Sequence, residues 1–179
     1  MTRFAIFFAM ILAGCTSDVG EGRSAERSDP LIERIVERQK PPISLTYART
    51  LVGLHERRDT AELKILIGVN PIQIEWCAAF VNGILNRQGV AGSESVSEYP
   101  LTARSFLQWG MEVFDEPQYG DVIVFPRGRS AWQGHVGFYV GTRVIDEIDY
   151  YIILGGNQDN SVSYELYPAY RALGVRRAI

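Results

Sequence analysis

The spacing of apolar residues changes along the chain, from helical intervals in the first half to alternation in the second. Helical spacing occurs at residues 31–38, 44–55, 59–67 and between Pro71 and Gly89, and Thr102 can cap a short helix that runs to Trp109. Strand patterns follow at 121–125, 136–140 and 150–154, with weaker ones at 164–166 and 175–178. Helices first and strands afterwards predict an α+β fold rather than alternating α/β units.

The first fifteen residues differ from the rest of the chain. A basic start is followed by an apolar run at residues 4–13, which is typical of a secretory signal peptide and shorter than the roughly 20 residues that span a bilayer. Residues 12–15, LAGC, resemble the bacterial lipobox, which implies cleavage before Cys15 and acylation of Cys15. The alternative is an ordinary leader with an incidental cysteine.

These features divide the chain into three parts. We expect a lipoprotein signal peptide at residues 1–14, a polar tether with a short helix at 15–41, and one catalytic domain at 42–179. The protein would then be lipid-anchored in the cell envelope, on the periplasmic side of the outer membrane if the cell is Gram-negative. A net charge of −3 provides no long-range attraction for nucleic acid, so we expect no nucleic-acid partner. We also expect the protein to be a monomer.

Cys77 is the first candidate for chemistry. If Cys15 is acylated, Cys77 has no intramolecular partner, and an odd thiol in an exported protein is a candidate reactive group. Cys77 also lies at a predicted helix start, where the positive end of the helix dipole favours the thiolate. The neighbouring Glu75 would oppose a thiolate if its carboxylate pointed the same way. The alternative is a small buried apolar residue.

His135 lies in an alternating segment at residues 134–141, on the face opposite Val136, Phe138 and Val140, which should face the core. The glycines around it leave room for a substrate. A catalytic imidazole needs an acceptor on its second nitrogen. If the strand at 150–154 pairs with the His135 strand, its end supplies Asn157 as the candidate acceptor, with Gln158 and Asp159 as weaker ones. The alternative is a Gly-Gly-Asn turn.

Four segments in order then carry a family resemblance: EWCAAFVN at 75–82, YGDVIVF at 119–125, GHVGFYVG at 134–141 and LGGNQ at 154–158. Together they resemble the NlpC/P60 and CHAP superfamily, in particular a phage-endolysin-like branch. The resemblance implies a papain-like α+β fold, with N-terminal helices packed on an antiparallel sheet, and hydrolysis of amide bonds in peptidoglycan. It assigns the nucleophile to Cys77, the base to His135 and the orienting residue to Asn157. Many CHAP relatives have an acidic residue where this chain has Gly155.

Three functions remain open from the sequence. The leading hypothesis is a lipid-tethered cysteine hydrolase that cuts the peptide part of peptidoglycan, with Trp76 and Tyr139 lining the substrate groove. The others are a non-catalytic wall-binding lipoprotein on the same fold and an acyl transferase with the same residues. We expect no cofactor and no metal, because a zinc amidase uses two or three histidines and the chain has only His55 and His135.

Overall fold

The computed structural model describes residues 43–179, which lie within one compact unit. The predicted leader, Cys15 and the predicted helix at 31–38 lie outside the described residues. Three helices come first: α2 (Thr46–Thr50), α3 (Thr60–Ile67) and α4 (Cys77–Asn86). None of the helices in residues 43–179 combines the length and apolar character needed to cross a membrane.

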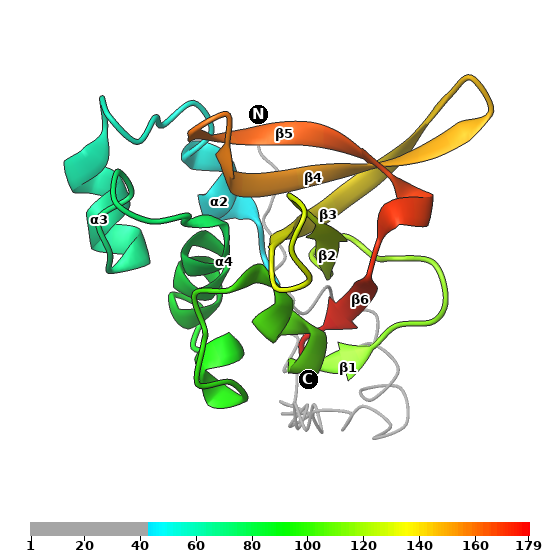
Figure 1. Cartoon of the computed structure of the whole chain (residues 1–179), viewed down its shortest axis with the longest axis horizontal. Coiled ribbons are helices and arrows are strands. Elements are labelled where there is room, and N and C mark those ends of the chain that lie inside the picture. The colour runs from blue at the N-terminus through cyan, green and yellow to red at the C-terminus, as the bar shows by residue number, and fades with distance from the viewer. Residues whose placement is uncertain (1–42) are drawn as a thin grey trace, which may run out of the picture. The chain divides into compact units, whose positions relative to one another are not determined.

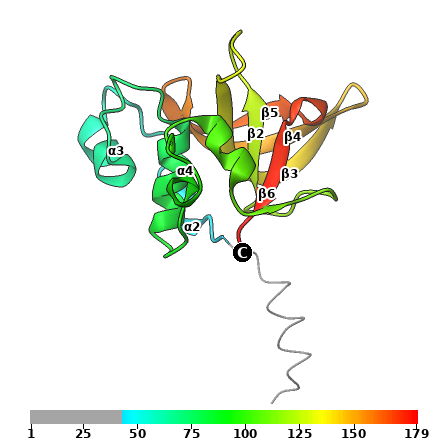
Figure 2. The ribbon, with the colours of Figure 1, turned by 60° about the horizontal axis from the view of Figure 1, so that its bottom comes forward.

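The second half of the chain forms a six-stranded antiparallel sheet with the strand order β1-β6-β2-β3-β4-β5. The helices lie beside this sheet in both ribbon views, which confirms the predicted α+β fold (Figures 1 and 2). The strands are β1 (Met111–Glu112), β2 (Val122–Pro126), β3 (Gly134–Ile145), β4 (Ile148–Gln158), β5 (Ser161–Pro168) and β6 (Gly174–Arg177).

Helix α4 is the element that joins the two layers. It begins at Cys77, close to the predicted start, and contacts both β3 and β4. Eight of its ten residues are buried, so packing against the sheet stabilises it rather than propensity alone. Trp76 occupies the N-cap position and makes no capping side-chain hydrogen bond. The first N–H groups of an α-helix have no intrahelical acceptor, and here no N-cap side chain supplies one.

Two helical segments are shorter or tighter than predicted. The segment at 44–55 is helical only over α2, because the amide of Gly53 donates to the Val162 carbonyl of β5 instead of continuing the helix. Residues Ala103–Gln108 form a 3₁₀ helix, η2. The hydroxyl of Thr102 donates to the Tyr99 carbonyl, so it does not cap an α-helix there.

Strands β3 and β4 are longer than the alternating pattern predicts. They meet at a two-residue turn, Asp146-Glu147, in which both residues have left-handed backbone angles (φ 49° and 62°). Such a turn suits the twist of a two-residue hairpin, although Asn-Gly or Asp-Gly is its usual sequence. The long β3–β4 hairpin extends beyond the helices in Figure 1. Its pairing confirms that the two strands are neighbours.

The sheet buries residues on both faces. Val136 and Phe138 pack in the core beneath the helices, as the alternation predicts. On the opposite face, a smaller apolar cluster forms around Ile123, Phe125 and Ile153. His135 belongs to this second face, where Tyr167 covers its ring; the ring centroids are 5.2 Å apart and nearly parallel. The histidine is therefore buried within the sheet and is not a surface residue.

Candidate active site

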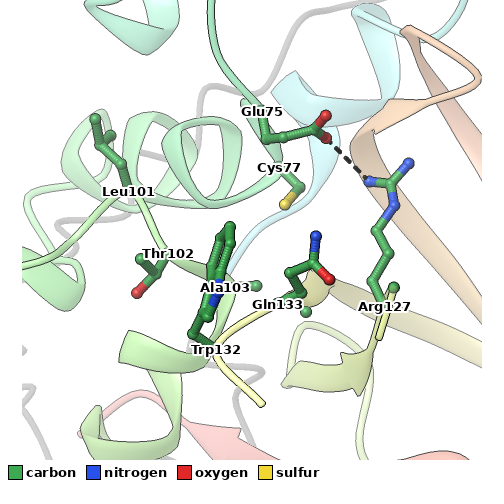
Figure 3. Close-up of a pocket in the computed structure, with 10 residues that line it drawn as sticks. Glu75, Cys77, Leu101, Thr102, Ala103, Arg127, Trp132 and Gln133 are labelled. Atoms are coloured by element: carbon green, nitrogen blue, oxygen red, sulfur yellow. Dashed lines mark ion pairs between the residues drawn. The ribbon is translucent and has the colours of Figure 1, made fainter. Parts of the chain in front are cut away.

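Cys77 lies at a cavity of about 310 Å³ at the start of α4. In Figure 3 its sulfur points toward the space beside Trp132 and Gln133, with Arg127 on the other side. The wall comes from the segment before α4, from η2 and its preceding loop, and from the loop between β2 and β3. The lining residues are Glu75, Cys77, Leu101, Thr102, Ala103, Arg127, Gly128, Trp132, Gln133 and Gly134.

Helix α4, which begins at Cys77, packs against β3, and the backbone of Val136, the residue after His135 in that strand, is among the influences on the pKa of the Cys77 thiol. Burial is the largest influence on this group and raises the pKa of the Cys77 thiol. Hydrogen bonding from the Val136 and Ala78 backbone and the charge of Arg127 act in the opposite direction, and Glu75 adds to the rise. The net rise keeps the resting thiol protonated at neutral pH.

Gln158 holds the imidazole of His135. Its Oε1 atom lies 3.0 Å from Nε2 of the ring. The amide nitrogen of Gln158 donates to the Ser163 carbonyl at 2.7 Å and to the Ser163 hydroxyl at 3.1 Å. These bonds direct Oε1 at the ring, so the neutral imidazole carries its proton on Nε2 and has its lone pair on Nδ1. Nδ1 is buried and has no hydrogen-bond partner among the described residues.

Burial also sets the charge of His135. Desolvation lowers its pKa to about 4; the Gln158 hydrogen bond opposes this shift, and the charge of Arg127 adds to it. The imidazole is therefore neutral at pH 7, and its Nδ1 atom is a free acceptor. A neutral imidazole of this kind can take the proton of a thiol as the sulfur attacks an electrophile.

Asn157 does not make the contact with His135 that the sequence predicts, because β4 contains a bulge. Gly155 pairs with Ser163 and Gln158 pairs with Ser161, so two residues of β4 oppose one residue of β5. Asn157 is one of the two, with a left-handed φ of 58°. Asparagine is among the few residues other than glycine that adopt this conformation readily.

The bulge determines which side chain reaches His135. Strict alternation places Asn157 on the face of Ile153 and Gly155, but the extra residue moves Gln158 onto that face instead. A Cβ atom added at Gly155 would lie 2.9 Å from Oε1 of Gln158 and 3.2 Å from Nε2 of His135. The amide of Gln158 thus fills the space next to the position where many relatives have an acidic residue.

The side chain of Asn157 turns toward the cavity instead. Its Nδ2 atom donates to Oε2 of Glu75 at 2.6 Å, and the same carboxylate oxygen lies 3.5 Å from Nη1 of Arg127. Both terminal nitrogens of Arg127 donate to the backbone carbonyl of Asn157 at 3.3 Å. Figure 3 shows the Glu75–Arg127 pair beside the Cys77 sulfur. We call these three residues the Glu75–Arg127–Asn157 cluster.

The two predicted groove aromatics lie elsewhere. Trp76 is fully buried and packs edge-on against Phe80, with its indole N–H donating to Glu56. Tyr139 is absent from the cavity wall and packs against Tyr151 on the far part of β3. The structure therefore corrects both predictions, because each ring packs against another aromatic residue and does not line the cavity.

Sequence reasoning missed Trp132 and Arg127, which do line the cavity. Both belong to the loop between β2 and β3, and the side chain of Trp132 is 67% exposed. A tryptophan three residues before the histidine, in a loop between two buried strands, is the pattern that could have identified it. Residues 43–179 contain no group of three or more His, Cys, Asp or Glu side chains arranged to hold a metal.

The described residues form an α+β protein with a buried thiol at a cavity. On β3, which packs against the helix of that thiol, the side-chain amide of Gln158 holds an imidazole. Comparison with known families identifies it further: the family model described as the CHAP domain matches residues 69–157, so the chain contains a CHAP domain. This confirms the resemblance to the NlpC/P60–CHAP superfamily. CHAP domains are typically amidases or peptidases that act on peptidoglycan. A comparison with curated proteins found no significant match.

Proposed function

We propose that this protein hydrolyses an amide bond in the peptide part of peptidoglycan by a thiol mechanism. Cys77 is the nucleophile, His135 is the general base, and Gln158 takes the orienting position that the sequence suggested for Asn157. The single observation that carries the proposal is the buried Nδ1 atom of His135, which has no hydrogen-bond partner among the described residues while Nε2 is held by Gln158.

The geometry supports a sequence of proton transfers that balances. Nδ1 of His135 accepts the thiol proton as Sγ of Cys77 attacks the scissile carbonyl carbon. The imidazolium then gives this proton to the leaving amine nitrogen as the C–N bond breaks, which leaves a thioester. Water then attacks the thioester carbon and gives one proton to Nδ1. The C–S bond breaks, the departing thiolate takes that proton back, and the released carboxylic acid loses its own proton to the solvent, so the site returns to its starting state.

Two features would stabilise charge during the attack. The tetrahedral oxyanion would form near the first turn of α4, where the backbone N–H of Cys77 has no intrahelical acceptor. Loss of one donor of this kind typically costs a factor of about 10²–10³ in kcat. Opposite the helix start, the exposed ring of Trp132 offers a flat apolar surface on which a sugar or peptide group of the substrate can stack.

The proposal extends to the place of action. Acylation of Cys15 after removal of residues 1–14 would attach a monomeric catalytic domain, residues 42–179, to a membrane of the cell envelope through the tether at 15–41. Radiolabelled palmitate tests this part: incorporation that disappears in Cys15→Ala is the expected result. A mature protein that starts at another residue, without lipid, would overturn it.

The decisive experiment compares the wild-type protein with Cys77→Ala on purified sacculi, with mass spectrometry of the soluble products. We expect new amine and carboxylate ends only with the wild type, whereas circular dichroism shows that both proteins are folded. Undiminished digestion by Cys77→Ala would refute the proposed chemistry. Products joined to a new amine, in place of a free carboxylate, would instead identify acyl transfer.

The burial and raised pKa of Cys77 favour one alternative, a wall-binding protein without catalysis. Iodoacetamide distinguishes the two. A catalytic Cys77 should be alkylated faster than free cysteine at mildly acidic to neutral pH, because His135 removes the thiol proton as the sulfur attacks the reagent. Alkylation no faster than that of free cysteine, together with retained binding to sacculi, would favour the binding function.

A further inference from the structure

We infer that Arg127 is a binding residue for a carboxylate group of the substrate, next to the bond that Cys77 attacks. The inference deepens the proposed function, because it states that the enzyme selects an acidic peptide. The identity of that substrate rests on the proposed function. The carboxylate site itself depends only on the cavity, and it can be tested without any hydrolysis.

The first argument is the charge of the cavity wall. Among its lining residues only Glu75 and Arg127 are charged, so Arg127 is the one cation that a ligand in this cavity meets. Its effect on the pKa of both Cys77 and His135 places the guanidinium near the reacting groups. An anionic group of a ligand would therefore bind beside the thiol, and the free carboxylates of peptidoglycan stem peptides have the matching charge.

The second argument is the orientation of the guanidinium. Both of its terminal nitrogens donate to the carbonyl of Asn157, which the β4 bulge turns away from the strand ladder. A guanidinium has five N–H donors in one plane, so this anchor leaves donors free for a second, bidentate partner. The backbone contact also reduces the side-chain entropy that Arg127 would lose on binding.

The third argument is that the contact between Arg127 and its present partner is easily exchanged, because the short hydrogen bond of Glu75, 2.6 Å from Nδ2 of Asn157, does not involve Arg127. Glu75 is 3.5 Å away, and its side chain is 80% exposed while that of Arg127 is 45% exposed. Ion pairs exposed to this degree contribute between zero and about 1 kcal/mol. A carboxylate held bidentately inside the cavity makes stronger, charge-assisted bonds. The carboxylate of Glu75 therefore occupies the site of the ligand until the ligand binds.

A pair of alkylating reagents tests the site. Iodoacetate carries a carboxylate and iodoacetamide is its neutral analogue, and both alkylate the Cys77 thiol. Any change in the pKa or nucleophilicity of the thiol affects both rates. The rate constant for iodoacetate divided by that for iodoacetamide therefore reports the binding of the carboxylate. We expect Arg127→Gln to lower this ratio by about tenfold, and Arg127→Lys to lower it less, because an ammonium keeps the charge without the fork geometry.

Arg129 provides the matched control. It lies in the same loop, is exposed and is absent from the cavity wall, so Arg129→Gln removes the same charge and should leave the ratio unchanged. An equal ratio in the wild type and Arg127→Gln would overturn the inference, as would an equal fall in both variants, which would show a general effect of charge. Reduced stability without a changed ratio would assign Arg127 a structural role only.

Hydrolysis gives the second, separate readout. A stem peptide with a free carboxylate should lose about tenfold in kcat/KM with Arg127→Gln, whereas the same peptide with that group amidated should be cleaved equally by both proteins. A protein that shows the reagent effect and cleaves no peptide would retain the carboxylate site and lose the proposed function. Cleavage of the peptide that Arg127→Gln does not affect would retain the proposed function and overturn the carboxylate site.

Discussion

The Oε1 atom of Gln158 lies 3.0 Å from Nε2 of His135, and this contact determines which ring nitrogen is available to the thiol. The donors and acceptors around Gln158 are arranged in one direction, from the ring N–H through the amide to the Ser163 carbonyl. The imidazole of His135, the proposed base, is thus oriented by a residue that a strand bulge, and not strict alternation, brings next to it.

Gln158→Met should reduce kcat by about 10²-fold, because the variant keeps the volume of the side chain but removes the acceptor for Nε2, so the ring can adopt the wrong tautomer. Steady-state kinetics with a soluble peptidoglycan fragment measures the effect. Asn157→Gly is the matched control. Glycine keeps the left-handed backbone at position 157, next to Gln158, and the Asn157 side chain does not contact His135. A larger loss in Asn157→Gly than in Gln158→Met would contradict the assigned roles.

Stability should decrease as the pH falls below 6.5, because His135 is buried and neutral. Its pKa is about 4 in the folded protein and 6.5 for an ordinary, solvated histidine, so between these limits the unfolded chain binds the extra proton. Stability from this group is complete above pH 6.5, declines as the pH falls to 4 and is then constant. A difference of about 2.5 pKa units corresponds to about 3 kcal/mol at most.

Urea unfolding from pH 4 to 7 tests this dependence. His135→Phe retains a ring beside Tyr167 and cannot titrate, so the difference in slope between it and the wild type isolates His135. His55 and the carboxylates are present in both proteins, and their contributions cancel. Parallel curves for the two proteins would mean that His135 is charged, or exposed, in the folded state.

The sequence could predict the elements whose cause is local or periodic. Apolar spacing identified α4 and its start near Cys77, and alternation identified the core face of β3 through Val136 and Phe138. The family resemblance, confirmed by the matching CHAP model, added the general activity. The thiol and the histidine were recognisable as candidates because so few residues of those types occur in the chain.

The remaining parts of the site depend on non-local packing, which no pattern in the sequence states. One extra residue in β4 exchanges the faces of Asn157 and Gln158, and its presence is visible only in the pairing with β5. Trp76 follows an exposed loop, yet its ring is fully buried and packs edge-on against Phe80. Trp132, in contrast, belongs to the loop between β2 and β3 and is 67% exposed at the cavity wall.

Gly156→Ala should destabilise the protein by about 1–3 kcal/mol, because α4 packs directly on this part of β4. An added Cβ atom would lie 2.5 Å from a ring carbon of Trp76 and 2.6 Å from Cβ of Phe80. Such contacts force a shift of the buried helix, the typical cost of overpacking. Gly141→Ala is the control, since the nearest atom there, on Ile152, is 3.8 Å away. Equal unfolding midpoints in urea for both variants would contradict the close packing.

Trp132→Ala should raise KM by about two- to tenfold with little change in the free energy of unfolding. The ring is 67% exposed at the cavity wall, so folding gains little from it, whereas stacking on a bound substrate contributes about 0.5–1.5 kcal/mol. Trp132→Phe keeps an aromatic face and should retain most of the affinity. Phe114 is 88% exposed and lies outside the cavity wall, so Phe114→Ala controls for the loss of any exposed aromatic ring. An equal rise in KM for Trp132→Ala and Phe114→Ala would mean that the substrate contacts a wider aromatic surface than this cavity, and that Trp132 has no specific part in binding.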